Sequence, residues 1–179
     1  PRCSGDLARL LQHRGTSASR TSPWPFSPAD ASPLAWWRVL PADRFRDAEH
    51  VLLRATLDKV AVLRGQTWIA AIHGDAAAGI AVALSLMPIG TTTLEIDIAM
   101  TAVLLSALDG DAASALMLSH VLRRVKLDHP FAAELAASWL THNPRHSPNR
   151  CRFGTAETAL WKALRAIDAR DATNVGGRA

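Results

Sequence analysis

Two stretches of this chain read Trp68-Ile-Ala-Ala-Ile-His-Gly-Asp-Ala-Ala77 and Leu104-Leu-Ser-Ala-Leu-Asp-Gly-Asp-Ala-Ala113, and each places Gly-Asp between two apolar segments. Gly74 and Gly110 are thirty-six residues apart, a spacing typical of repeated helix pairs. Glycine accepts a positive φ after the last turn of a helix, and aspartate caps the first amides of the next helix. We therefore predict two similar helical corners, and they decide the fold.

The composition favours an all-α protein. Hydrophobic residues make up 49% of the chain and tyrosine is absent, whereas β proteins usually draw on tyrosine, threonine and isoleucine. A length of 179 residues suits one domain with a substantial core. We expect antiparallel helical hairpins, forming a compact bundle or a short repeat array of six to eight helices between about Ala35 and Ala169.

We divide the chain into a Ser-, Pro- and Arg-rich arm over residues 1–34, one helical domain over residues 35–170 and a frayed tail over residues 171–179. The arm is expected to be disordered or loosely docked because its composition buries little surface. Its Pro23-Trp-Pro-Phe26 segment can dock onto its own domain or onto a partner, and the first is more economical. The arginines of residues 1–30 fit either a solvated basic tail or organelle targeting.

Breaker residues and caps predict the individual helices. A first helix is expected from Pro33 to before Pro41, and Asp43 is expected to cap a longer helix through Leu63 with Gly65 as its C′ residue.

Breaks at residues 74–75, 88–93, 109–111 and 128–130 divide residues 67–142 into about five helices. A basic loop follows, and then a final helix from about Thr155 to Ala169. In that helix Leu160, Leu164 and Ile167 share one face, while Asp168 is expected to point toward solvent.

The stretch from Gly110-Asp111-Ala-Ala-Ser-Ala115 through Leu127-Asp128-His129-Pro130 resembles a tetratricopeptide repeat. In that family Gly-Asp, a small residue and a closing Asp-Pro punctuate a helical hairpin. Gly79 takes the place of Ala115 in the earlier stretch, where a small residue lets the paired helix approach closely. The resemblance is confined to residues 67–142 and implies a scaffold whose concave face binds a peptide. An ordinary helical bundle with two similar corners accounts for the same residues.

Positive charge supplies the candidate binding residues. The chain carries a net charge of +4, and the basic positions near the end of the second unit and after the next helix can form a phosphate-binding patch if they are adjacent. Cations at a helix C-terminus are also expected from the helix dipole alone. The partner-binding candidates are Arg123, Arg124, Lys126, His129, Arg145, His146, Arg150 and Arg152.

No set of residues matches a catalytic or metal-binding pattern. His142, His146 and Cys151 are ligand types at short spacing, but a structural zinc site normally needs four ligands, so we expect a basic loop without metal or cofactor. His120 lies among apolar positions and is interpreted as a core or boundary histidine rather than a general base. We expect no catalytic residue.

Two further observations bear on the environment of the protein. Residues 76–94 carry no charge, but Pro88 and three threonines favour a buried helix over a membrane span, which needs about 20 strongly apolar residues. The two cysteines, Cys3 and Cys151, do not form a dense disulfide framework, so we expect a reducing, cytoplasmic compartment.

These observations favour a non-catalytic protein–protein interaction module, an adaptor or assembly subunit, that uses a groove between helical pairs. The alternative is a nucleic-acid-binding helical protein using a basic patch at residues 123–126 and 145–152, and a third hypothesis is an enzyme of unknown class. A protein partner is expected but its identity and the oligomeric state do not follow from the sequence.

Overall fold

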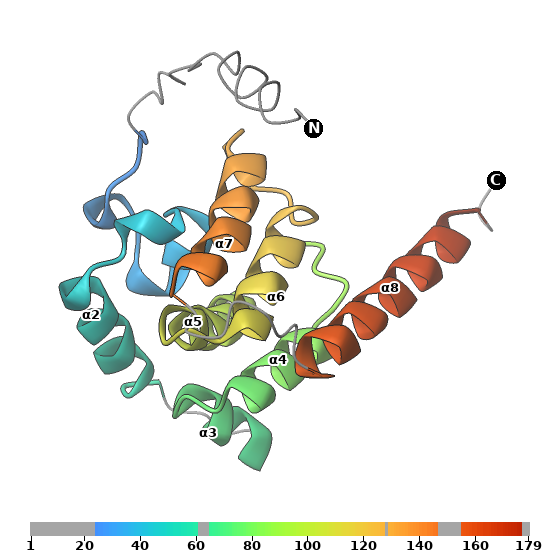
Figure 1. Ribbon diagram of the computed structural model, residues 1–179, viewed down its shortest axis with the longest axis horizontal. Helices are drawn as coiled ribbons and strands as arrows, with labels where there is room; N and C mark the ends of the chain where they lie inside the picture. The colour runs from blue at the N-terminus through green and yellow to red at the C-terminus, as the bar shows by residue number, and fades with distance from the viewer. Residues whose placement is uncertain (1–23, 61–64, 128, 147–154, 177–179) are drawn as a thin grey trace, which may run out of the picture.

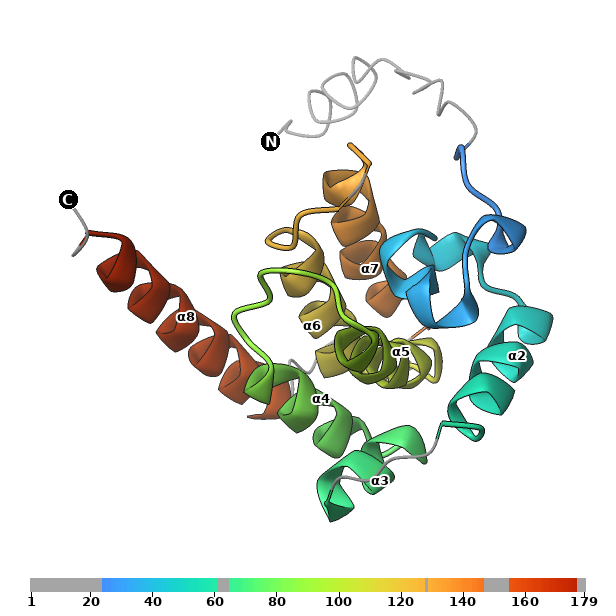
Figure 2. The same cartoon turned by 180° about the vertical axis from the view of Figure 1, so that it is seen from behind.

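The computed structural model describes residues 24–60, 65–127, 129–146 and 155–176. Within these ranges the chain is helical and contains no strand (Figure 1 and Figure 2), which confirms the all-α prediction. None of these helices is both long and apolar enough to cross a membrane. The 3₁₀ helices are η1 (Pro28–Asp30), η2 (Pro33–Arg38) and η3 (Ala42–Arg44), and the α-helices are α2 (Asp47–Leu57), α3 (Gln66–Ile72), α4 (Ala76–Ser85), α5 (Leu94–Leu108), α6 (Ala112–Leu122), α7 (Ala132–His146) and α8 (Thr155–Gly176).

Helix α5 forms the centre of the fold. Every residue from Ala99 to Ala107 is buried, because α2, α3, α4, α6 and η2 all pack against this helix. Its only charged residues, Glu95 and Asp97, are confined to the first turn, where acidic groups complement the helix dipole. Short connections make α3 and α4, α5 and α6, and α6 and α7 antiparallel hairpins (Figure 1).

The two Gly-Asp corners have the predicted geometry. Gly74 and Gly110 both have a φ of +96°, which closes the preceding helix in the left-handed conformation that glycine tolerates. In each corner the aspartate side chain then accepts a hydrogen bond from the amide three residues later, at 2.9 Å for Asp75 and 2.7 Å for Asp111. The repeated sequence therefore produces two equivalent connections, from α3 to α4 and from α5 to α6.

The predictions for residues 43–65 were wrong in three places. Helix α2 ends at Leu57 instead of continuing through Leu63. Asp43 does not cap a long helix, because it lies in η3 and α2 begins only at Asp47. The Glu49 carboxylate accepts the Arg46 backbone N–H at 2.9 Å, and this acidic residue in the first turn sets the start of the helix. Gly65 has a φ of −52° and precedes α3 as its N-cap, so it does not end the preceding helix.

The aromatic end of the predicted arm packs on its own domain. The Trp24 Nε1–H donates to the Val39 carbonyl at 3.0 Å, and the Trp24 ring lies 5.3 Å from that of Phe131. The Phe26 ring completes this cluster, 5.0 Å from the His129 ring. The interpretation of Pro23-Trp-Pro-Phe26 as a self-docking segment is thus confirmed for the described residues 24–26, whereas residues 1–23 lie outside the described ranges.

The last helix is longer than predicted. Leu160 and Leu164 are buried on its inner face, at 4% and 0% exposure, as their spacing indicated. Helix α8 continues to Gly176, past the predicted end at Ala169, because alanine and arginine in the following turn favour helix. Residues 171–176, expected to belong to a frayed tail, are helical.

Candidate functional site

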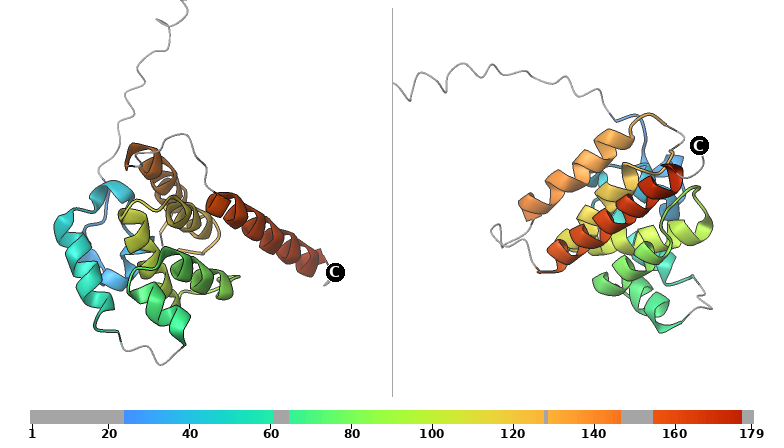
Figure 3. Two further views of the ribbon diagram at one scale, coloured as in Figure 1. Left: turned by 60° about the horizontal axis from the view of Figure 1, so that its bottom comes forward. Right: turned by 90° about the vertical axis from the view of Figure 1, so that its right-hand side faces the viewer.

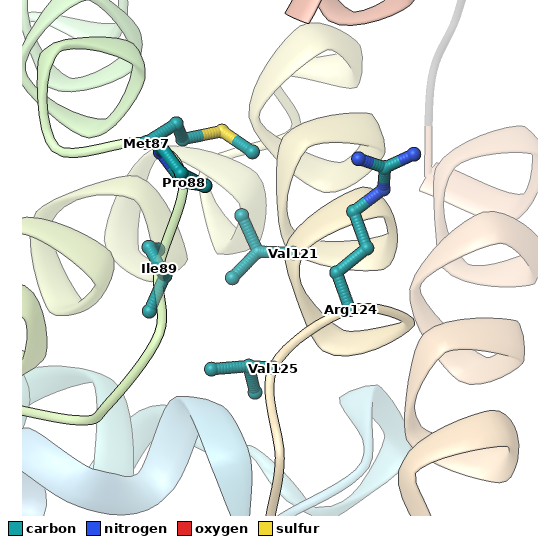
Figure 4. Close-up of a pocket in the computed structure, with 6 residues that line it drawn as sticks. All are labelled: Met87, Pro88, Ile89, Val121, Arg124 and Val125. Carbon is teal, nitrogen blue, oxygen red and sulfur yellow. The ribbon is translucent and has the colours of Figure 1, made fainter. Parts of the chain in front are cut away.

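A small pocket lies between the α4–α5 connection and the end of α6 (Figure 4). Its volume is about 150 Å³. The connection contributes Met87, Pro88 and Ile89, and α6 with the turn after it contributes Val121, Arg124 and Val125. Val121 and Val125 are almost fully buried, so the pocket presents an apolar wall beside one guanidinium group. This combination accepts an apolar side chain or tail that carries an anionic group nearby.

Arg124 also links α6 to α8. Its Nη1 lies 2.7 Å from Asp168 Oδ1, and the two side chains are 39% and 36% exposed. The His120 Nε2 lies 3.6 Å from the same carboxylate oxygen, which is too long for a hydrogen bond. The Asp168 carboxylate is therefore held chiefly by Arg124.

The imidazole of His120 is nearly buried. Only 10% of its side-chain surface is exposed. Burial lowers the pKa of His120 below its ordinary value of 6.5; the charges of Arg124 and Arg123 act in the same direction, and Asp168 opposes them. The ring is therefore neutral at pH 7, and it adds no positive charge to the cluster.

Helix α8 lies at the periphery of the described structure (Figure 3). It packs mainly against α6, and its C-terminal half extends away from the other helices (Figure 3). On its outer surface Trp161 is 43% exposed, with the Arg165 guanidinium 5.8 Å from the ring centroid. The helix leaves a large aromatic residue accessible and places Asp168 against Arg124, which lines the pocket.

The structure brings together three of the predicted binding residues. Arg123, Arg124 and Lys126 all lie at the C-terminal end of α6 and have exposed surface. His129 does not join them, because its Nε2 is 2.8 Å from the Arg38 carbonyl oxygen. Its ring packs against the aromatic cluster described above, so His129 serves to hold the N-terminal segment.

The remaining candidates are not placed with this group. Arg145 and His146 occupy the last turn of α7. Because α7 runs antiparallel to α6, their backbone positions lie about 20 Å along the bundle axis from the basic residues at the C-terminal end of α6. Their side chains lie outside the described part of the structure, as do Arg150 and Arg152 entirely. The adjacency required for a joint patch of residues 123–126 and 145–152 does not occur at Arg145 and His146.

The remaining ligand-type and titratable residues can be placed in part. Among the described residues no group of three His, Cys, Asp or Glu side chains is arranged to hold a metal ion; Cys151 and the His146 side chain lie outside that set. His120 and Asp168 approach each other, but neither lines the pocket.

Sequence reasoning missed Asp168 and the α4–α5 connection as parts of the site. Leu160, Leu164 and Asp168 are spaced four residues apart, so they share one helix face, and this signal contradicts the expected solvent-facing position of Asp168. Met87 and Ile89 carried no comparable signal, because their role depends on how the connection folds back over α6. The chain matches no protein-family model, and no curated protein or solved structure is detectably similar to it.

Proposed function

We propose that this chain is a non-catalytic protein-interaction module, an adaptor or assembly subunit. Its partner occupies the recess between the α4–α5 connection and α6, next to α8. The observation that carries this proposal is the pocket, whose apolar wall of Val121 and Val125 lies beside Arg124. A volume of about 150 Å³ suits one anchoring side chain of a larger partner, and interfaces commonly rely on such anchors.

The exposed surface of α8 supports the same proposal. Trp161 and Arg165 lie together on this helix, and tryptophan and arginine are the residue types most enriched at the centres of protein interfaces. A helix at the periphery also offers more surface to a partner than one enclosed by neighbours. The low cysteine content leads us to propose further that the module works in a reducing compartment.

The methionines allow a direct test of the pocket. The chain has three; Met100 and Met117 are fully buried, whereas Met87 is partly exposed and lines the pocket. Replacing methionine with its diazirine analogue therefore places one accessible photoreactive group at the proposed site. The labelled protein is irradiated in lysate from its source cells with and without nuclease. The cross-linked products are identified by mass spectrometry.

We expect a defined protein to be cross-linked through residue 87 after nuclease treatment, and to be lost when the labelled protein carries Met87→Leu. Equal cross-linking by the Met87→Leu protein would show that the pocket is not the contact site and would overturn the proposal. Products that disappear with nuclease would instead favour nucleic-acid binding at the basic end of α6. The Met87→Leu substitution conserves volume, so the fold is retained as a control.

A further inference from the structure

The Arg124–Asp168 contact joins the pocket to α8 through one residue. Arg124 lines the pocket and at the same time holds the Asp168 carboxylate at 2.7 Å. A guanidinium that already binds a carboxylate is a site of the right chemistry for a second one. Any ligand carboxylate that enters the pocket must share or replace the contact with Asp168.

The charges around the pocket identify the kind of ligand that fits. Arg123, Arg124 and Lys126 provide three exposed cations at the end of α6 and just after it, and Asp168 pairs with one of them, Arg124. The local excess of positive charge attracts a ligand with several carboxylates. The apolar wall of the pocket requires that this ligand also present an aliphatic side chain.

We infer that the pocket binds an acidic polypeptide segment through one branched aliphatic side chain, and that Asp168 holds the Arg124 guanidinium until the partner's carboxylate replaces it. This inference rests on the proposed interaction function and names the chemistry of the partner. Binding exchanges one carboxylate for another at Arg124. It releases Asp168 and with it a charged attachment of α8, whose buried apolar residues in the described part of the helix are Leu160 and Leu164.

The test uses short synthetic peptides and the full chain. The probe is N-acetyl-Glu-Asp-Leu-Asp-Glu-amide, and its two controls replace the acids with Gln and Asn or the leucine with glycine. Binding is followed by NMR through the methyl signals of Val121 and Val125. Hydrogen exchange of the α8 amides is measured with and without saturating peptide. The protein variants are Arg124→Gln and Asp168→Asn, matched by Arg44→Gln and Asp43→Asn on the exposed surface of η3.

We expect the acidic leucine peptide to bind, and both control peptides to bind more weakly. Asp168→Asn should tighten binding about two- to fivefold, the range for removal of a competing exposed ion pair. Arg124→Gln should weaken binding about tenfold, while the η3 variants leave it unchanged. Exchange of the α8 amides should speed up when the peptide is bound to the unmodified chain.

Several results would overturn the inference. Equal binding of the Gln/Asn peptide would show that the peptide's carboxylates do not contribute to binding. Unchanged or weaker binding by Asp168→Asn would show that Asp168 does not compete with the peptide. Absence of methyl shifts at Val121 and Val125 would show that the pocket does not receive the side chain. If the peptides fail while cross-linking through Met87 yields a protein partner, the partner chemistry is wrong and the interaction function stands. If cross-linking fails as well, both proposals fall.

Discussion

The Asp97→Ala substitution should detach η2 from the central helix. Asp97, in the first turn of α5, accepts the Trp37 Nε1–H at 2.8 Å through Oδ1. It also accepts Arg38 Nε at 3.1 Å and Nη2 at 3.2 Å, one on each carboxylate oxygen. Trp37 is fully buried, and the side chains of Arg38 and Asp97 are 23% and 14% exposed. One carboxylate thus satisfies three donors that come from a distant part of the sequence.

The free-energy cost can be estimated from these contacts. Removing the carboxylate leaves the indole N–H of Trp37 buried without a partner, which costs about 1–3 kcal/mol. Arg38 can turn partly to solvent, so the loss of its ion pair adds about 1 kcal/mol. Because the two losses combine, we expect Asp97→Ala to lower the free energy of unfolding by about 2–4 kcal/mol. Asp97→Asn keeps an acceptor for Trp37 and should cost about half as much.

Urea denaturation of both variants, followed by circular dichroism, measures these differences. A loss of about 3 kcal/mol corresponds to a decrease in Tm of about 6–12 °C for a chain of this size. Asp58→Asn, an exposed acid after α2, provides the matched control and should change stability little. A decrease below about 1 kcal/mol for Asp97→Ala, or equal effects of Ala and Asn, would refute the assigned role of the indole hydrogen bond.

Three further substitutions test one corner, the packing of α4 on α5 and the α6–α8 contact. Gly110→Ala should lower the free energy of unfolding by about 1–2 kcal/mol, because φ is +96° and an added Cβ would meet no other atom within 4 Å, so only backbone strain acts. Gly79→Ala should raise it by about 0.5–1 kcal/mol in the same urea assay, since its Cβ would lie 3.7 Å from Val103 Cγ2, an ordinary contact; destabilisation would contradict this fit. Because the pKa of His120 is lowered in the folded protein, the imidazole of the unfolded chain is protonated first as the pH falls. The free energy of unfolding that the neutral ring contributes is therefore present above pH 6.5 and is lost as the pH falls below it. His120→Gln should remove that part of the pH dependence between about pH 7.5 and 5.5, and an unchanged slope would count against it.

The sequence was sufficient to predict the corners because each depends on neighbouring residues. Gly74-Asp75 and Gly110-Asp111 supply both the positive φ and the cap within two positions, so no distant contact is needed to specify them. The start of α2 was missed although it is also local. Asp43 and Asp47 are both good candidates near a helix start, and Glu49, whose carboxylate accepts the Arg46 amide, decides between them.

The site could be predicted only in part because it depends on distant contacts. Arg123, Arg124 and Lys126 are adjacent in sequence and stay together in the fold. His129 was assigned to the same surface, but its ring packs against Phe131 and against Phe26 of the docked N-terminal segment. Nothing near residue 129 in the sequence indicates the contact with Phe26. Asp168 contacts Arg124 because of how α8 crosses α6. The sequence spacing shows which face of α8 carries Asp168, but it does not show which residue that face contacts.

The proposed competition at Arg124 requires that α8 be held weakly compared with the core helices. Leu160 and Leu164 are its buried apolar residues in the described part of the helix, and burying two leucines provides about 3–6 kcal/mol, which the loss of conformational freedom in the helix largely offsets. An exposed ion pair of about 0.2–1 kcal/mol is negligible for α5, which is enclosed on all sides. For α8 the ion pair is a substantial part of the small net free energy that docks the helix on α6. A ligand carboxylate at Arg124 can therefore shift the position of the whole helix.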